Sequence, residues 1–198
     1  MKFRLKKERR FLSGKVWVSI LIIAIMVLST AGFLIGGRGQ SGSLSYNKHT
    51  FTKEPNGYYT NLNGKNVRFD FFPAEINETF ADKGAIDRIK NTKMIYMTSN
   101  FSGKYAQTTE EIKYELSMRL AREFGIYAAS GFTTNTSYKT MTVSCSNATQ
   151  FAPVVDFKEG NNTGIRLEGN CVVVEGNSNS GFIALKDRLL YGMHGIME

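Results

Sequence analysis

The feature that most constrains this chain is an uncharged run of 20 residues, Val16–Ile35, which reads VWVSILIIAIMVLSTAGFLI. As a helix this run is about 30 Å long, which matches the hydrocarbon core of a bilayer. A helix in a soluble core normally keeps a polar face over such a length. Trp17 lies near one end, where aromatic rings sit at the level of the lipid headgroups. The run therefore predicts a transmembrane helix that acts as a signal anchor.

The charges beside this run predict its orientation. Residues 1–15 hold seven Lys and Arg side chains and one acid, Glu8. Only Arg38, Lys48 and Lys53 follow within about 20 residues of the run. Because basic residues stay on the cytoplasmic side, we expect a cytoplasmic tail, 1–15, and an exported part beyond residue 35. Membrane lipid is thus an expected partner, through Val16–Ile35 and the basic tail.

Two alternatives to the anchor remain open. A cleaved signal peptide would use Val16–Leu28 as its apolar region and Ser29-Thr30-Ala31 as its small-residue site, although the apolar run continues beyond them to spanning length. A type IV pilin-like leader would continue into a long amphipathic helix. Residues 36–43 instead have the composition of a flexible linker. Both the anchored and the cleaved forms export the rest of the chain.

The distribution of charge argues against nucleic-acid binding. The chain has a formal net charge of +8, but residues 16–198 hold 18 basic and 16 acidic side chains. A nucleic-acid binder would carry its basic stripe on the folded domain. We therefore expect no nucleic-acid partner.

The exported part is expected to be one α+β domain, 46–198, after a flexible linker, 36–45. Short strands separated by Asn56-Gly57 and Asn63-Gly64 predict a β-meander, because these pairs favour hairpin turns. A buried strand, a helix that ends at Gly125 and another strand predict a βαβ unit. An amphipathic helix closes the chain. The expected strands are 50–53, 58–61, 67–72, 94–97, 126–129, 131–133, 141–145, 154–157 and 171–175, and the expected helices are 83–90, 108–124 and 182–193.

Some polar residues have a structural interpretation. Thr108 and Glu111 fit a capping box, and the helix N-terminus also accounts for Glu110. His49 and His194 are expected on the surface. Asp187 and Arg188 are expected to form a solvated pair on the last helix.

The chain has two cysteines, Cys145 and Cys171, and both lie in the exported part. Outside the cytoplasm such a pair predicts a disulfide, whereas two buried free thiols are the alternative. A zinc site would need more ligands than these cysteines and two separated histidines supply, so we expect no metal. Export also makes N-glycosylation possible at five Asn-x-Ser/Thr acceptors: Asn77, Asn100, Asn135, Asn147 and Asn161.

No catalytic or cofactor motif is present in the sequence. Phosphate-binding glycine loops, the nucleophile elbow, S-x-x-K and H-E-x-x-H are all missing. The positional candidates for ligand binding are Thr98, Ser99, Ser130 and Thr133, which follow two strands of the predicted parallel pair and would share its carboxyl edge. Their structural alternative is that Ser and Thr simply close strands and begin turns.

The second half of the chain also resembles a family. The residues concerned are Cys145-Ser-Asn147-Ala-Thr149, Pro153-Val154-Val155, Asn170-Cys171-Val172-Val173 and Asp187-Arg188-Leu189-Leu190-Tyr191, together with Gly64–Pro73. They resemble a group of uncharacterised, membrane-anchored archaeal proteins. The resemblance implies an exported domain with paired cysteines and carries no activity to transfer.

These features predict a non-catalytic, single-pass membrane protein that displays a domain for binding a small polar ligand or a protein partner outside the cell. A membrane-tethered enzyme such as a hydrolase is the alternative, as is an accessory subunit of an envelope complex. A cleft that joins acids of perturbed pKa to Ser99 or Ser130 would favour the enzyme.

Overall fold

The computed structural model describes residues 14–36, 42–135 and 140–198, and the side chains of the first helix only at residues 16–27. Contacts divide the chain into two compact units, 1–41 and 42–198. Most of the predicted basic tail and linker lies outside the described residues. The linker was predicted too long, because its residues 43–45 belong to the first strand.

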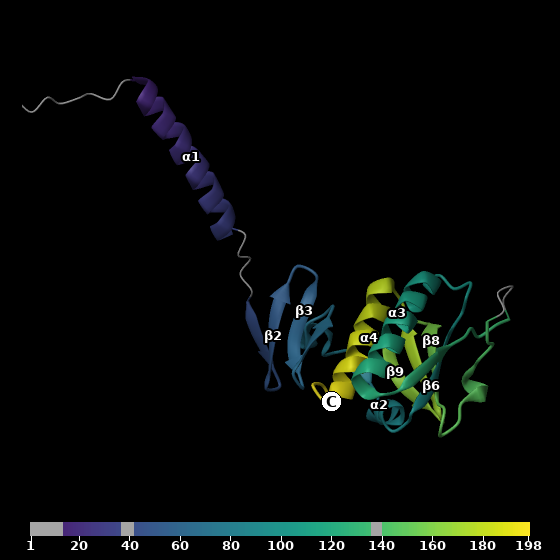
Figure 1. Ribbon diagram of the computed structural model, residues 1–198. Helices are drawn as coiled ribbons and strands as arrows, with labels where there is room; N and C mark the ends of the chain where they lie inside the picture. The colour runs from purple at the N-terminus through teal and green to yellow at the C-terminus, as the bar shows by residue number, and fades with distance from the viewer. Residues whose placement is uncertain (1–13, 37–41, 136–139) are drawn as a thin grey trace, which may run out of the picture. The chain divides into compact units, whose positions relative to one another are not determined.

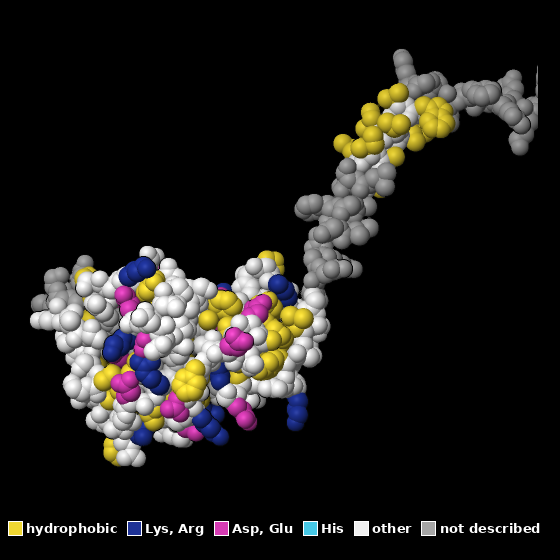
Figure 2. Space-filling view, turned by 180° about the vertical axis from the view of Figure 1, so that it is seen from behind, with side chains coloured by type: hydrophobic (Ala, Val, Ile, Leu, Met, Phe, Trp, Pro, Cys, Tyr) yellow, Lys and Arg dark blue, Asp and Glu magenta, His cyan; other side chains and the backbone are white. Residues whose placement is uncertain are grey.

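The first unit contains the helix α1, Gly14–Gly36, which includes the apolar run. Its described side chains, residues 16–27, are exposed within this unit, and Figure 2 shows them as mostly hydrophobic. Over the residues that the structure describes, none of the helices combines the length and the apolar character needed to cross a membrane.

The second unit is an α+β domain, as its strand and helix patterns predict, and its strands form two separate sheets. Its first part is an antiparallel meander of β1 (Ser43–Tyr46), β2 (His49–Glu54), β3 (Gly57–Leu62) and β4 (Lys65–Phe69). At the two predicted hairpins, Asn56-Gly57 and Asn63-Gly64, φ is positive at Gly57, Asn63 and Gly64. A third turn, Asn47-Lys48, was not predicted and also has positive φ at both residues. Asparagine and glycine tolerate that conformation, which explains why the hairpins fall there.

The second sheet has six strands in the order β5-β9-β10-β8-β6-β7. The strands β10, β8, β6 and β7 run parallel to one another, whereas β9 is antiparallel to β10 and parallel to β5. Their bounds are β5 Phe80–Ala81, β6 Met94–Ser99, β7 Tyr127–Ser130, β8 Val154–Glu159, β9 Gly164–Glu168 and β10 Cys171–Gly176. The predicted parallel pair of β6 and β7 is therefore confirmed.

Three helices cover one face of this sheet: α2 (Lys83–Lys90), α3 (Ala106–Arg119) and α4 (Asn179–His194). Short turns η1 (Pro73–Ile76), η2 (Leu120–Phe124) and η3 (Cys145–Asn147) complete the domain. In Figure 1 the helices α3 and α4 stand between the meander and the strands β6 and β8. The apolar core fills both sides of this helix layer, because Phe51 and Phe69 of the meander and Val172 and Val174 of β10 belong to one cluster.

The helix α3 differs from its prediction at its first turn. It begins at Ala106, so Thr108 lies inside it and donates a hydrogen bond to Asn179 Oδ1 at 2.8 Å. The predicted capping box is therefore wrong. The predicted end is right, because η2 follows α3 and Gly125 stops it in the left-handed region with φ 67°.

Two predicted strands are replaced by a crossing segment. Residues 131–153 connect β7 to β8, and the described part contains only an isolated bridge between Phe132 and Thr142 and the turn η3. The predicted strands 131–133 and 141–145 are thus wrong. Figure 1 shows this segment on the side of the sheet away from α3 and α4.

A buried charge network joins the meander to the helix layer. Lys186 of α4 is 2% exposed and pairs with Asp70 and, at 2.9 Å, with Glu115 of α3. Asp187 is fully buried, and its Oδ2 accepts the backbone N–H groups of Asp70 and Phe71 at 2.7 and 2.8 Å. These contacts fix the end of the meander against α4.

Two surface predictions fail beside this network. Asp187 and Arg188 are buried and point to different partners, since Arg188 donates to the carbonyl oxygens of Thr79 and Glu198. The imidazole of His194 is only 10% exposed and lies 3.0 Å from Glu123 Oε2. These residues are buried because α4 packs against the meander on one side and against the six-stranded sheet on the other.

Candidate functional site

The carboxyl ends of the parallel strands meet at one edge of the six-stranded sheet. Ser99 ends β6, Ser130 ends β7 and Glu159 ends β8. Ligands of open α/β sheets commonly bind at this edge, where strand ends and loops leave a crevice. This edge is therefore the expected position of a ligand-binding site.

A cavity of about 280 Å³ opens at this edge beside β8. This volume is slightly below the usual range for ligand pockets, so only a molecule as small as an amino acid or a monosaccharide would fit. Its lining residues, five of them polar or charged and one aromatic, come from the end of β6, the start of the crossing segment and β8. The residues are Asn100, Thr133, Asp156, Phe157, Lys158 and Glu159.

Among the residues that line this cavity, Asp156 has a carboxyl group with a raised pKa. It is half-buried on β8, on the sheet face opposite the helices. Burial raises the pKa of its carboxyl group, Lys158 and Lys113 oppose this rise, and Glu168 adds to it. The neutral acid is thus favoured over a wider pH range than at the surface.

A buried polar cluster lies behind the same edge, between β6 and α3. Lys113 is 1% exposed, and its Nζ donates to Ser99 Oγ at 3.0 Å and to the Gly131 carbonyl oxygen at 2.8 Å. Glu110 completes the cluster, because its Oε1 lies 2.6 Å from Lys113 Nζ and accepts the Ser99 hydroxyl at 2.7 Å. Burial lowers the pKa of Lys113, and the ion pair with Glu110 opposes that shift. Glu110 therefore links α3 to β6 through Ser99 and Lys113. The sequence attributes Glu110 only to the N-terminus of the helix, so this link was not predicted.

The four ligand-binding candidates predicted from strand position do not lie together in one site. They are Thr98, Ser99, Ser130 and Thr133. Thr133 alone lines the cavity, and its N–H donates to the Ser99 carbonyl oxygen at 3.0 Å. Ser99 is held inside the buried cluster, and Thr98 is buried on the opposite sheet face, where it donates to the Val143 carbonyl oxygen at 2.7 Å. Ser130 is exposed at the end of the edge strand β7.

Sequence reasoning missed Asp156 and Lys113. Both leave a signal that could have found them, because Asp156 interrupts the apolar run of β8 and Lys113 borders the apolar stripe of α3. A charged residue inside an apolar pattern needs a partner or a function.

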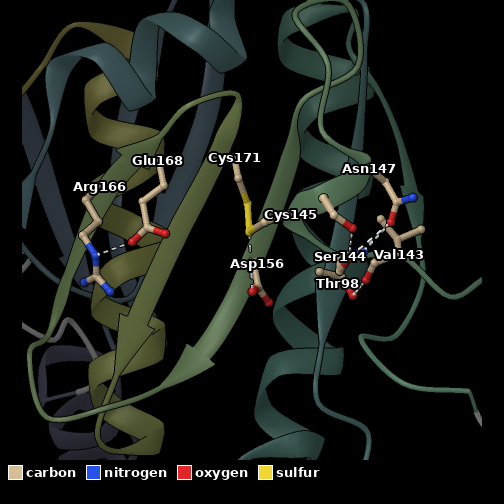
Figure 3. The surroundings of a disulfide bond; sticks show 10 residues. Thr98, Val143, Ser144, Cys145, Asn147, Asp156, Arg166, Glu168 and Cys171 are labelled. Carbon is tan, nitrogen blue, oxygen red and sulfur yellow. Dashed lines mark hydrogen bonds and ion pairs between the residues drawn. A yellow bond between two sulfur atoms is a disulfide. The ribbon is translucent and has the colours of Figure 1, made fainter.

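The disulfide between Cys145 and Cys171 is present, with Cα atoms 5.2 Å apart, so this prediction is confirmed. It joins η3 of the crossing segment to the first residue of β10 (Figure 3). Within the described ranges, no group of three or more His, Cys, Asp or Glu side chains is placed to hold a metal ion.

The asparagines of the five glycosylation acceptors are all exposed: Asn77, Asn100, Asn135, Asn147 and Asn161. Asn100 lies at the cavity itself, where its Oδ1 accepts the N–H and the hydroxyl of Ser102. A glycan at Asn100 would therefore stand at the mouth of the candidate site.

Comparison of the chain with protein-family models, with curated proteins and with solved structures finds no match.

Proposed function

We propose that this chain is a non-catalytic, single-pass membrane protein whose domain 42–198 lies outside the cytoplasm and binds a small polar ligand. The observation that carries the proposal is the cavity at the carboxyl edge of β6 and β8, with Thr133 and Asp156 among its lining residues. A hydroxyl, an amide and two carboxyl groups there offer hydrogen bonds to a ligand rich in O–H or N–H groups. We therefore propose a monosaccharide, an amino sugar or a free amino acid as the ligand class.

The membrane part of the proposal is supported by the sequence. Val16–Ile35 carries no charge and follows a tail with seven basic residues. A disulfide and five exposed glycosylation acceptors in the domain fit an oxidising compartment outside the cytoplasm.

A hydrolase remains the alternative function, because Ser99 Oγ and Lys113 Nζ lie 3.0 Å apart, as in serine–lysine catalytic pairs. Two observations favour binding over this chemistry. Both residues are 1% exposed, and Glu110 already accepts the hydrogen bond of the Ser99 hydroxyl and forms an ion pair with Lys113. A nucleophile needs access to its substrate, which neither residue has from the cavity.

Ligand binding is tested with the full chain in detergent micelles and a panel of monosaccharides, amino sugars and free amino acids, by saturation-transfer NMR. We expect at least one class to bind, and Thr133→Val to weaken it about tenfold because the variant keeps the shape and loses the hydroxyl. Ser130→Ala is the matched control, since Ser130 ends a neighbouring strand and does not line the cavity. Equal loss in both variants, or no binding by any class, would contradict the proposed function.

A further inference from the structure

A second cavity lies beside the candidate site and shares a wall with it. Its volume is about 400 Å³, and its lining comes from the residues before α3 and from the turns after β8 and β10. Glu159, the last residue of β8, lines both cavities. The candidate site therefore has more room than the first cavity alone provides.

The carboxyl group of Glu159 is held in place where the two cavities meet. Its Oε1 accepts the backbone N–H of Tyr105 at 3.2 Å. A Cβ atom at Gly103 would collide with the same oxygen and push the carboxyl group aside. The side chain is exposed, and over the described residues it belongs to none of the ion pairs. Its negative charge is therefore available to a ligand.

Each of the two cavities also contains a lysine. Lys158 lines the first cavity and Lys104 lines the second, where its Nζ lies 5.0 Å from the centre of the Tyr105 ring. Both side chains are exposed, and neither belongs to an ion pair in the described part of the chain. The two cavities thus share one negative charge, and each adds a positive charge of its own.

Asp156 is the other acid of the first cavity. It lies on the opposite face of β8 from Glu159, because side chains alternate along a strand. Burial raises its pKa, which favours a neutral form that does not repel an anion at Lys158.

We propose that the ligand of this site is a free dicarboxylic amino acid of the size of glutamate, which narrows the proposed function and rests on it. The ammonium group of the ligand pairs with Glu159, its α-carboxylate with Lys158 and its side-chain carboxylate with Lys104. Asn161 and Asn177, which also line the second cavity, offer amide N–H groups to the side-chain carboxylate. A neutral monosaccharide would use none of the three charges, and hydrogen bonds to charged groups are about twice as strong as neutral ones.

The first test compares ligands and leaves the protein unchanged. The full chain in detergent micelles is titrated at neutral pH with L-glutamate, N-acetyl-L-glutamate and D-glucose, and calorimetry gives each Kd. We expect L-glutamate to bind about tenfold more tightly than either of the others, because only it has an ammonium group for Glu159. Attraction by the net charge of the chain alone, which is +8, would favour N-acetyl-L-glutamate, because that ligand lacks the positive charge of L-glutamate. Equal or tighter binding of N-acetyl-L-glutamate or D-glucose overturns the proposal.

The second test changes one charge of the site at a time. Glu159→Gln keeps an oxygen for the Tyr105 N–H and loses the charge, so it should bind L-glutamate about tenfold more weakly and no longer prefer it to N-acetyl-L-glutamate. Lys104→Gln should weaken L-glutamate more than L-alanine, which has no side-chain carboxylate. Glu54→Gln removes an exposed carboxylate from β2 and is the matched control. An unchanged preference in Glu159→Gln, or the same loss in Glu54→Gln, contradicts the proposal.

The outcomes distinguish this proposal from the proposed function. If D-glucose binds, Thr133→Val weakens it and L-glutamate does not bind, the cavity has a ligand and the dicarboxylic amino acid is wrong. If no member of the panel of sugars and amino acids binds, both proposals are wrong.

Discussion

Glu123 shows at the scale of single residues how burial and charge oppose each other in this domain. Burial alone would raise the pKa of its carboxyl group, but hydrogen bonds from His194 and Arg119 outweigh burial and lower the pKa to about 2. Its Oε1 lies 3.0 Å from Arg119 Nε, and both side chains are almost fully buried. The ionised carboxylate is therefore part of the folded state.

This lowered pKa predicts a pH dependence of stability. A carboxyl group whose pKa is lower in the folded than in the unfolded state stabilises the fold above about pH 4.5 and loses that effect as pH falls toward 2. Above pH 4.5 we expect Glu123→Gln to lower the free energy of unfolding by about 2 kcal/mol, and the difference to vanish near pH 2. Urea unfolding at a series of pH values measures it. Glu111→Gln, an exposed change on α3, should show no such trend.

The candidate site was only partly predictable at this scale. The pattern of strands placed Thr133 at the correct edge, because parallel strands end together. It could not place Ser99 or Glu110, whose partners depend on how α3 lies across β6. Asp156 interrupts the apolar run of β8, which is a signal in the sequence, but its contact with Cys145 depends on how the turn η3 covers that strand.

At the scale of elements, the end of α3 depends on one glycine. Gly125 has φ 67°, and a Cβ atom added to it would meet no heavy atom within 4 Å. Gly125→Ala should therefore lower the free energy of unfolding by about 1 kcal/mol through backbone conformation alone. Gly42→Ala is a matched control, because its Cβ also meets open space and its φ is ordinary. Thermal unfolding of the two variants checks the prediction, and an equal shift in both would contradict it.

Element boundaries followed the sequence where local chemistry determines them. The helix α2 spans 83–90 as its pattern predicts, with Asp82 as its N-cap. The prediction failed where a tertiary partner replaces the local one, as when Thr108 bonds to Asn179 instead of capping α3. The strand β9 was missed because its short alternating pattern, Gly164–Glu168, gains its stability from pairing with β10.

At the scale of the whole molecule, the proposed topology places the domain 42–198 on the outer side of the membrane. Protease added to intact cells should digest this domain and spare the tail 1–15, because in this topology the seven basic residues of the tail keep it on the cytoplasmic side. Antibodies to tags at the two ends of the chain measure the outcome. A C-terminal tag that survives in intact cells and is lost only after lysis would contradict this orientation.

The contacts of Asp70 with Lys186 and Asp187 join residues 116 and 117 positions apart in the chain. The meander is synthesised before α4, the helix that holds it. The carboxylate of Asp187 and the N–H groups of Asp70 and Phe71 find each other only when almost the whole domain has been made. Until then the chain lacks the closure that would fix its tertiary structure, and an extended chain is the form that a narrow export channel can pass. In the proposed exported topology, this order of elements would keep the meander without its partners on α4 until the domain has crossed.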